Sequence, residues 1–118
     1  MAAPNIVNVA TILGETAVAD LSTTLTTTLL TCAAENVNKI NLIRVTNVTD
    51  NDATVTADIE KGGTHKKIAN EVTVPANSAV DIIDKGNSFY LEETDLIRGG
   101  ASAGSTLEFV TSYEALAD

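Results

Sequence analysis

Basic residues are scarce in this chain. Its 118 residues include only seven Lys and Arg against sixteen Asp and Glu, which gives a formal net charge of -9 at pH 7. A surface that binds nucleic acid needs clustered Lys and Arg to neutralise phosphate groups. The few basic residues here are spread along the whole sequence, so the composition argues against DNA or RNA as a partner.

Long apolar segments and an export signal are missing as well. A membrane-spanning helix needs about 20 consecutive apolar residues, and no run in the sequence approaches that length. The opening MAAPNIVNVAT has neither the basic region nor the long apolar region of a secretory signal. We therefore expect synthesis in a cytoplasm and no membrane partner.

The residues that most enzymes depend on are few. His65 is the only histidine, so a His-based metal site or a Ser-His-Asp relay has at most one member available. Cys32 is the only cysteine, and its apolar neighbours are typical of a small buried hydrophobic residue. No Gly-rich loop precedes a helix in the manner of a phosphate-binding site. The sequence therefore predicts no enzyme activity, no cofactor and no catalytic residue.

Two short acidic segments deserve separate mention. Asp50 and Asp52 flank Asn51, and Glu92, Glu93 and Asp95 lie close together further along the chain. Their oxygens are the kind of ligand that Ca²⁺ prefers, but neither segment has the spacing of an EF-hand loop. We assign no metal site here and expect surface turns, while calcium binding at either segment stays open.

The stretch TTLTTTLLT, residues 23–31, shows what the chain has in abundance. Leu21, Leu25 and Leu29 recur at a spacing that fits one face of a strand and also one stripe of a helix. The branched side chain of Thr is unfavourable in a helix and suits a pleated sheet. The pattern therefore predicts a half-buried strand with these leucines pointing inward.

The rest of the chain repeats this organisation of short apolar segments separated by turn residues. About eight or nine strands with no convincing helix predict an antiparallel β-sandwich, of the jelly-roll or immunoglobulin-like type, that spans residues 1–118 as a single domain. The apolar phase shifts between Leu42 and Ile43, which predicts a bulge there. The expected strands fall within residues 6–21, punctuated at Gly14, 23–31, 40–49, 54–60, 68–74, 80–84, 89–91, 96–101 and 107–113.

Within residues 54–60 the alternation predicts that Val55, Ala57 and Ile59 point to one side and Thr54, Thr56, Asp58 and Glu60 to the other, solvent-facing side. Phe109 and Tyr113 share a face with Leu107, which predicts core positions for them. Gly62 and Gly63 predict a hairpin turn, with His65 near its exposed tip.

Residues 1–31 are the candidate contact segment. They contain no Lys or Arg and only two acids, so strands formed there would be poorly protected as sheet edges. The apolar contact candidates within this segment are Leu21, Leu25 and Leu29. Phe89 and Tyr90 are two further candidates, because adjacent residues of one strand cannot both point inward. An exposed aromatic ring there would also suit a carbohydrate-binding module.

Several stretches resemble small β-sandwich virion structural proteins of tailed bacteriophages, notably marine phages that infect cyanobacteria. They are IVNVATILGETAVADLSTTLTTTLLT, INLIRVTNVTD with VTADIE, and IANEVTVPANSAVDIIDKGNSFYLEETDLIRGGASAGSTLEFVTSYE. The resemblance covers nearly the whole chain. The family commonly has Gly where this chain has Thr94, so we expect the turn there to differ.

The resemblance implies a non-enzymatic, repeated part of a virus particle. The first expectation is an outer capsid decoration protein, and a neck, collar or tail-fibre attachment protein is the alternative. The implied partners are the major capsid protein or neck and tail proteins, together with other copies of the chain in a homo-oligomer such as a trimer. The implied location is the virion.

Overall fold

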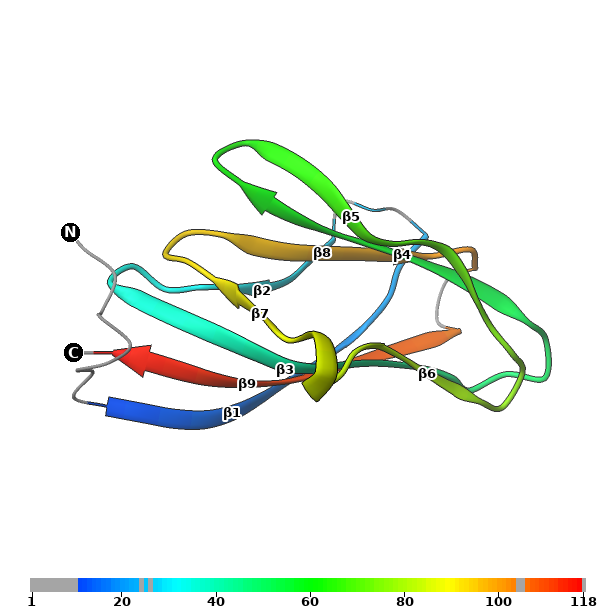
Figure 1. Ribbon diagram of the computed structural model, residues 1–118. Coiled ribbons are helices and arrows are strands. Elements are labelled where there is room, and N and C mark those ends of the chain that lie inside the picture. Colours follow the sequence, from blue (N-terminus) through cyan, green and yellow to red (C-terminus); the bar gives the residue numbers. More distant parts are fainter. Residues whose placement is uncertain (1–10, 24, 26, 104–105, 118) are drawn as a thin grey trace.

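The computed structural model describes residues 11–23, 25, 27–103 and 106–117. The described chain is all-β, with nine strands in two antiparallel sheets and one short 3-10 helix. Figure 1 shows the two sheets as two layers, one above the other. This confirms the predicted two-layer sandwich. The strands are β1 (Thr11–Asp20), β2 (Thr27–Thr31), β3 (Asn36–Asn47), β4 (Ala53–Lys61), β5 (Thr64–Val74), β6 (Ala79–Ile83), β7 (Phe89–Leu91), β8 (Leu96–Ala101) and β9 (Leu107–Ala117), and the helix is η1 (Lys85–Asn87).

The strands pair in nested order along the chain. β4 pairs with β5, β3 with β6 and β7, β2 with β8, and β1 with β9, all antiparallel. The nested pairs wind into one sheet of order β1-β9-β3-β6, with β7 beside β3, and a second sheet of order β2-β8-β4-β5. This is the strand order of a jelly roll, since an immunoglobulin fold keeps its first two strands in the same sheet.

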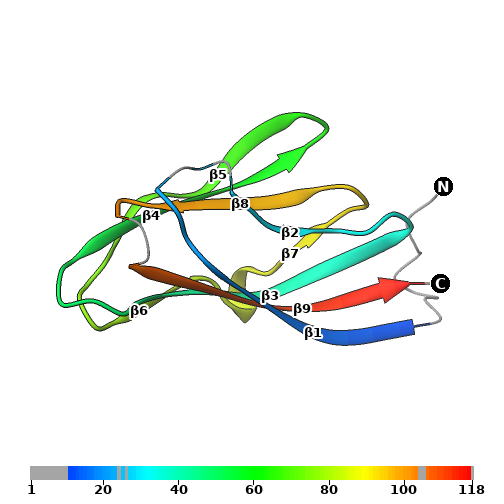
Figure 2. The ribbon, with the colours of Figure 1, turned by 180° about the vertical axis from the view of Figure 1, so that it is seen from behind.

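The layout gives the molecule two opposite flanks. β1 lies near β2 and β5 lies near β6, so each flank carries one edge of each sheet. Figure 1 is viewed from the side of β5, β6 and β7, and Figure 2 from the side of β1. We call these the β5 flank and the β1 flank.

The buried side chains follow the predicted alternation. In β4, Val55 and Ala57 are buried and Ile59 packs against the core, whereas the alternate Thr54 and Thr56 are only half-buried. Phe109 is buried on the inner face of β9, as its spacing from Leu107 indicated. The fully buried large apolar side chains are those of Leu21, Ile40, Ile43, Val45, Val55, Val74, Leu91, Ile97, Leu107 and Phe109.

The predicted strand over residues 23–31 is shorter in the structure. Only Thr27–Thr31 forms β2, and Leu21 and Leu25 precede it outside any strand. Leu21 is nevertheless 1% exposed, and Leu29 packs against the core. Both side chains lie over Gly99, where an added Cβ would stand 2.7 Å from Leu29 Cδ1 and 3.4 Å from Leu21 Cδ2. The absence of a side chain at Gly99 makes room for them.

Other strand boundaries also differ from the prediction. β1 runs through Gly14 without a break, because its exposed backbone pairs regularly with β9 on both sides of that residue. β3 begins at Asn36, inside a segment expected to be a turn. The predicted bulge near Leu42 is confirmed by register shifts in β3 between residues 40 and 42 and between residues 43 and 44. Residues 6–10 of the first expected strand and 104–105 of the last expected turn lie outside the described residues.

Asn47 holds the turns together at one end of the sandwich. Its side chain is 1% exposed. Its Nδ2 donates to the carbonyl oxygens of Asn51 at 2.8 Å and Val74 at 3.0 Å, and its Oδ1 accepts from Thr49 N at 2.9 Å. A buried amide is stable only when its donors and acceptor are satisfied, and Asn47 meets this condition by connecting the β3–β4 turn to the end of β5.

Thr94 adopts a backbone conformation that favours glycine. Its φ is 69°, and a β-branched residue at positive φ is strained by its own Cβ. The turn is held in place because Thr94 N donates to Cys32 O at 2.9 Å and Asp95 N donates to Glu92 O at 3.1 Å. The structure therefore explains why glycine suits this position and threonine strains it.

We expect Thr94→Gly to increase the free energy of unfolding by about 0.5 to 1 kcal/mol, because relief of the strain exceeds the entropy that glycine adds to the unfolded chain. Urea denaturation followed by circular dichroism measures the change. Thr73→Gly is the matched control, since Thr73 is an exposed residue within β5 and should lose stability on the same substitution. Equal losses in the two variants would contradict the strain at Thr94.

Candidate functional site

β1 is an edge strand with uncovered apolar side chains. It pairs with β9 on one side, and no described strand pairs with its other side. Ile12 is 61% exposed, Leu13 55% and Val18 73%. These three are among the few large hydrophobic side chains that the described chain leaves exposed, and all lie on this one strand. An exposed apolar edge of this kind is typical of an interaction surface.

The two faces of β1 are uncovered to different extents. Residues opposite each other in an antiparallel pair point to the same face, and Ala19 and Ala17 lie opposite the buried Phe109 and Thr111. The odd-numbered residues of β1 therefore point to the inner face of the sheet. Leu13 is also odd-numbered but more than half exposed, so the other sheet does not cover this end of β1.

β1 lacks the features that protect natural sheet edges. Edge strands are usually short, bulged or supplied with Lys or Pro. β1 has ten residues in an unbroken register with β9, and its sequence TILGETAVAD contains no Lys, Arg or Pro. β5, the other long edge, contains Lys66 and Lys67 and has register shifts against β4. The contrast makes β1 the less protected of the two.

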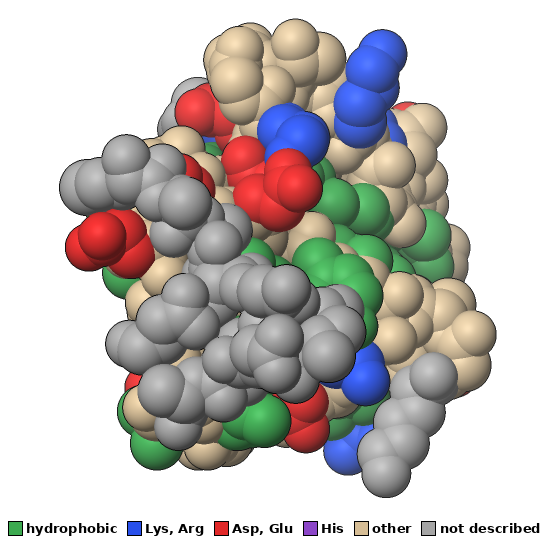
Figure 3. All heavy atoms as spheres, turned by 60° about the vertical axis from the view of Figure 1, so that its left-hand side comes forward, with side chains coloured by type: hydrophobic (Ala, Val, Ile, Leu, Met, Phe, Trp, Pro, Cys, Tyr) green, Lys and Arg blue, Asp and Glu red, His purple; other side chains and the backbone are tan. Residues whose placement is uncertain are grey.

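An apolar groove opens on the β5 flank. Its volume is about 480 Å³, and it lies where β7 approaches the inner face of β4 and β5. Figure 3 shows hydrophobic side chains exposed on this side of the molecule, with acidic and basic side chains at their border. The lining residues are Ile59, Lys61, Ile68, Phe89, Tyr90, Glu92 and Asp95.

The charges at the rim of the groove are mostly paired. Lys61 Nζ lies 3.0 Å from Asp95 Oδ2 and also pairs with Glu92. Asp95 Oδ2 accepts from the backbone N of Glu92 at 3.1 Å. Lys66 lies opposite Ile59 in the β4–β5 register and hence on the groove face. Within the described residues Lys66 forms no ion pair, so it is an available positive charge.

The predicted contact residues lie in three different places. Leu21 is part of the core, so its assignment as a contact residue is corrected: its side chain is buried by the fold itself. Leu29 is half-buried against the same core, and Leu25 is half-buried beside the outer face of the β2-β8-β4-β5 sheet, where it lines a small pocket of about 170 Å³. These three leucines do not form a common surface.

Phe89 and Tyr90 behave as two adjacent strand residues should. Phe89 packs against the core, whereas Tyr90 is 48% exposed, and both line the groove. The exposed residues of β1 were not among the predicted contacts. The signal was present in the sequence, because adjacent Ile12 and Leu13 point to opposite faces of a strand and an edge strand rarely buries both.

A compact charged cluster on the outer face of the second sheet is another candidate site. Asp58 is fully buried and accepts two hydrogen bonds from Arg98, at 3.0 Å from Nε and 2.6 Å from Nη2. His65 Nδ1 lies 3.9 Å from Asp58 Oδ2, and His65 Nε2 lies 3.3 Å from Glu60 Oε1. The alternation of β4 predicted a solvent-facing Asp58, but Arg98 from β8 and His65 from β5 cover it.

The buried carboxylate of Asp58 has its charge and hydrogen bonds satisfied within the fold, mainly by Arg98. Hydrogen bonds from Arg98 are the main cause that lowers the pKa of Asp58 below its ordinary value of 3.8, against the opposing effect of burial. His65 is exposed in the β4–β5 hairpin, just past the Gly62-Gly63 turn, and its ring also approaches Asp58 and Glu60. An aspartate held as an ion by a bidentate arginine is typical of a structural link between strands.

The acidic side chains at residues 50–52 and 92–95 accept hydrogen bonds from nearby turn residues. Asp52 Oδ1 accepts from Ala76 N at 2.9 Å, and Asp50 Oδ1 accepts from Asn77 Nδ2 at 3.0 Å. Glu93 Oε2 accepts from Glu35 N at 2.7 Å. In the part of the chain that the structure describes, no three His, Cys, Asp or Glu side chains are grouped so as to hold a metal ion.

Cys32 is buried, as its apolar neighbours indicated. Its thiol is 3.4 Å from Asn36 O and donates to it, and burial is the main cause that raises the pKa of this thiol above 9.0. A raised pKa keeps the thiol protonated and unreactive at neutral pH.

Comparisons with known proteins return no match: no family model, no curated protein and no solved structure is similar to this chain. The described residues also include no helix with the length and hydrophobicity needed to cross a membrane. Candidate functions therefore depend on the surfaces described above and on the sequence resemblance.

We expect Asp58→Asn to lower the free energy of unfolding at neutral pH by about 2 kcal/mol, the scale of hydrogen bonds to a charged group. The folded pKa of Asp58 is lowered, so its stabilising contribution is complete above the ordinary value of 3.8 and is lost as the pH falls through the folded pKa. The difference between the variant and the original chain should shrink in that acidic range. Urea denaturation at several pH values measures it.

The control for this prediction is Asp81→Asn. Asp81 forms an equally short bidentate pair with Arg44, but the two side chains are 37% and 49% exposed. Exposed pairs contribute little because water screens them, so this variant should change stability less. A larger loss for Asp81→Asn than for Asp58→Asn would contradict a structural role for the buried pair.

Proposed function

We propose that this protein is a non-enzymatic structural component of a tailed-phage virion, an outer capsid decoration protein that docks through β1. The observation that carries the proposal is the long, regular edge strand with exposed Ile12, Leu13 and Val18. A protein that has to be held in a repeated assembly needs such an apolar, unpaired surface.

Two further observations support a structural role. The buried titratable side chains of the described residues, Cys32, Asp58 and Asp95, all have hydrogen-bond partners inside the fold. The net charge of -9 suits a protein on the outside of a particle, where no contact with packaged DNA is needed. The jelly roll itself does not choose a function, because viral capsid proteins and lectins share it.

We expect Val18→Lys to prevent incorporation into virions, since a charge would have to be buried in the apolar contact. Purified particles are analysed by quantitative mass spectrometry for the ratio of this protein to the major capsid protein. Val48→Lys is the matched control, because Val48 is 51% exposed but lies outside β1. Normal incorporation of Val18→Lys, or an equal loss with Val48→Lys, would contradict docking through β1.

Point substitutions in β1 test docking more clearly than removal of residues 1–31 does. That deletion would take away the buried Leu21 together with β1 and β2, the edges of both sheets. A loss of incorporation would then reflect a loss of folding. Separating heads from tails before the analysis also distinguishes a capsid decoration protein from a neck, collar or tail-fibre attachment protein.

A carbohydrate-binding module is the second candidate, and the groove on the β5 flank favours it. The groove combines the exposed ring of Tyr90 with polar Lys61 and Glu92, and sugar sites pair an aromatic face with hydrogen-bonding groups. Calorimetry against a panel of glycans should then show binding that Tyr90→Ala removes. The virion proposal expects no such binding in the groove.

A further inference from the structure

The two long edge strands of this molecule match each other in length. β1 has ten residues and β5 has eleven, and they lie on opposite flanks. The remaining edges, β2 and β6 with five residues each and β7 with three, are too short to pair along the length of β1. Apart from β1 itself, only β5 offers β1 an unpaired strand of similar length in another copy of the described chain.

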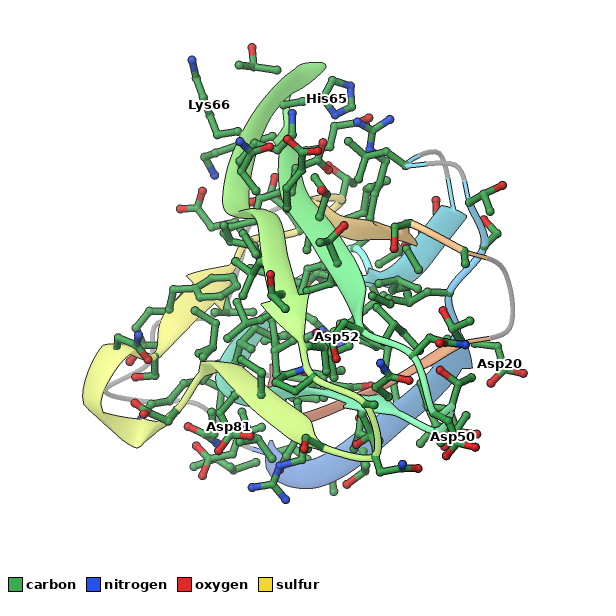
Figure 4. The ribbon with its side chains drawn as sticks, turned by 90° about the vertical axis from the view of Figure 1, so that its right-hand side faces the viewer. Asp20, Asp50, Asp52, His65, Lys66 and Asp81 are labelled. Carbon is green, nitrogen blue, oxygen red and sulfur yellow. The ribbon has the colours of Figure 1, made fainter. Side chains whose placement is uncertain are left out.

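The charges of the two strands are opposite. β1 contains Glu15 and Asp20 and no basic residue. β5 contains Lys66 on its groove face, Lys67 next to it on the face of Asp58, and one acid, Glu71, so its two lysines leave it with a net positive charge. Figure 4 looks along the sandwich and shows Lys66 on the β5 side of the molecule and Asp20 on the β1 side. Opposite charges across neighbouring strands are favourable, and like charges are unfavourable.

The faces match as well as the edges. Ile12, Val18 and Asp20 share the outer face of β1, and the first two are strongly exposed. The groove beside β5 presents the apolar Ile59 and Ile68 next to the positive Lys66. A strand added next to β5 extends that sheet, so one of its faces covers the mouth of the groove.

We infer that β1 of one copy pairs with β5 of a second copy and covers its groove with Ile12 and Val18, so that copies of the chain associate head to tail. This rests on the proposed function, because it names the partner of the same β1 surface. An interface between two different surfaces closes into a ring or continues as a chain of subunits, and a closed ring of three would be the trimer that the resemblance implies.

A symmetric pairing of two β1 strands offers their acids no basic partner. β1 contains Glu15 and Asp20 but no Lys or Arg, so neither carboxylate would meet a positive charge there. The mixed pair places these acids beside a strand that carries Lys66 and Lys67, which makes β5 the electrostatically better partner for β1.

The experiment reverses the charges of each strand separately. One variant carries Glu15→Lys and Asp20→Lys, and the other carries Lys66→Glu and Lys67→Glu. Sedimentation velocity over a range of protein concentrations gives the mass of each variant alone and of an equimolar mixture. The original chain should associate, and each variant alone should associate at least about tenfold more weakly. The mixture should regain association as alternating dimers, chains or even-membered rings, since every β1–β5 contact between unlike copies again joins opposite charges. A ring of three cannot alternate, so a variant with all four substitutions, in which every contact joins opposite charges, should restore that assembly.

Each possible result bears on the inference. Recovery in the mixture, with weakening by high salt, supports head-to-tail pairing. A monomeric original chain, or a mixture that stays dissociated, overturns it. Loss through β1 reversal without loss through β5 reversal also overturns it but leaves docking of β1 to a capsid intact. Glycan binding in the groove without self-association overturns it in favour of a sugar ligand. Asp20→Lys and Lys66→Glu alone serve as milder variants if a double variant loses its circular dichroism spectrum.

Discussion

The hydrogen bonds between neighbouring strands are the constraint on which this structure depends. Each strand offers backbone donors and acceptors on two sides, and a sheet satisfies both sides only for the strands inside it. The nested order of pairing gives β9, β3, β8 and β4 partners on both sides and leaves the unpaired sides on two flanks. The broad faces of the sandwich are closed surfaces, so the flanks are where this protein can still form backbone contacts.

The edge strands on the two flanks differ in how well they are protected against pairing with another chain. Short strands or lysines protect β2, β5, β6 and β7, whereas β1 is long, regular and apolar. The groove on the other flank shows the opposite arrangement, with apolar side chains recessed between paired charges. One molecule therefore carries both an exposed apolar edge strand and a recessed apolar groove, and both are features of interaction surfaces.

Local patterns predicted the strands because the alternation of side chains between two faces depends only on neighbours in sequence. They predicted the inward faces of β4 and β9 and the bulge near Leu42. They did not predict the burial of Asp58 and Asn47, because the groups that cover these residues come from distant strands and turns. Within residues 1–31 the sequence pattern singled out Leu21, which is buried, and not Ile12 and Val18, which are exposed, since the offset between the two sheets decides which apolar residues are covered.

The nested pairing also affects how the chain folds during translation. β1 is synthesised first among the described strands, yet its partner β9 is the last. During translation β1 therefore waits with both sides unpaired until nearly all of the described chain has left the ribosome, and such long-range closure is slow. The unpaired backbone of β1 is therefore exposed in the nascent chain before the domain folds. During that interval, chaperones and neighbouring nascent chains compete with β9 for this strand.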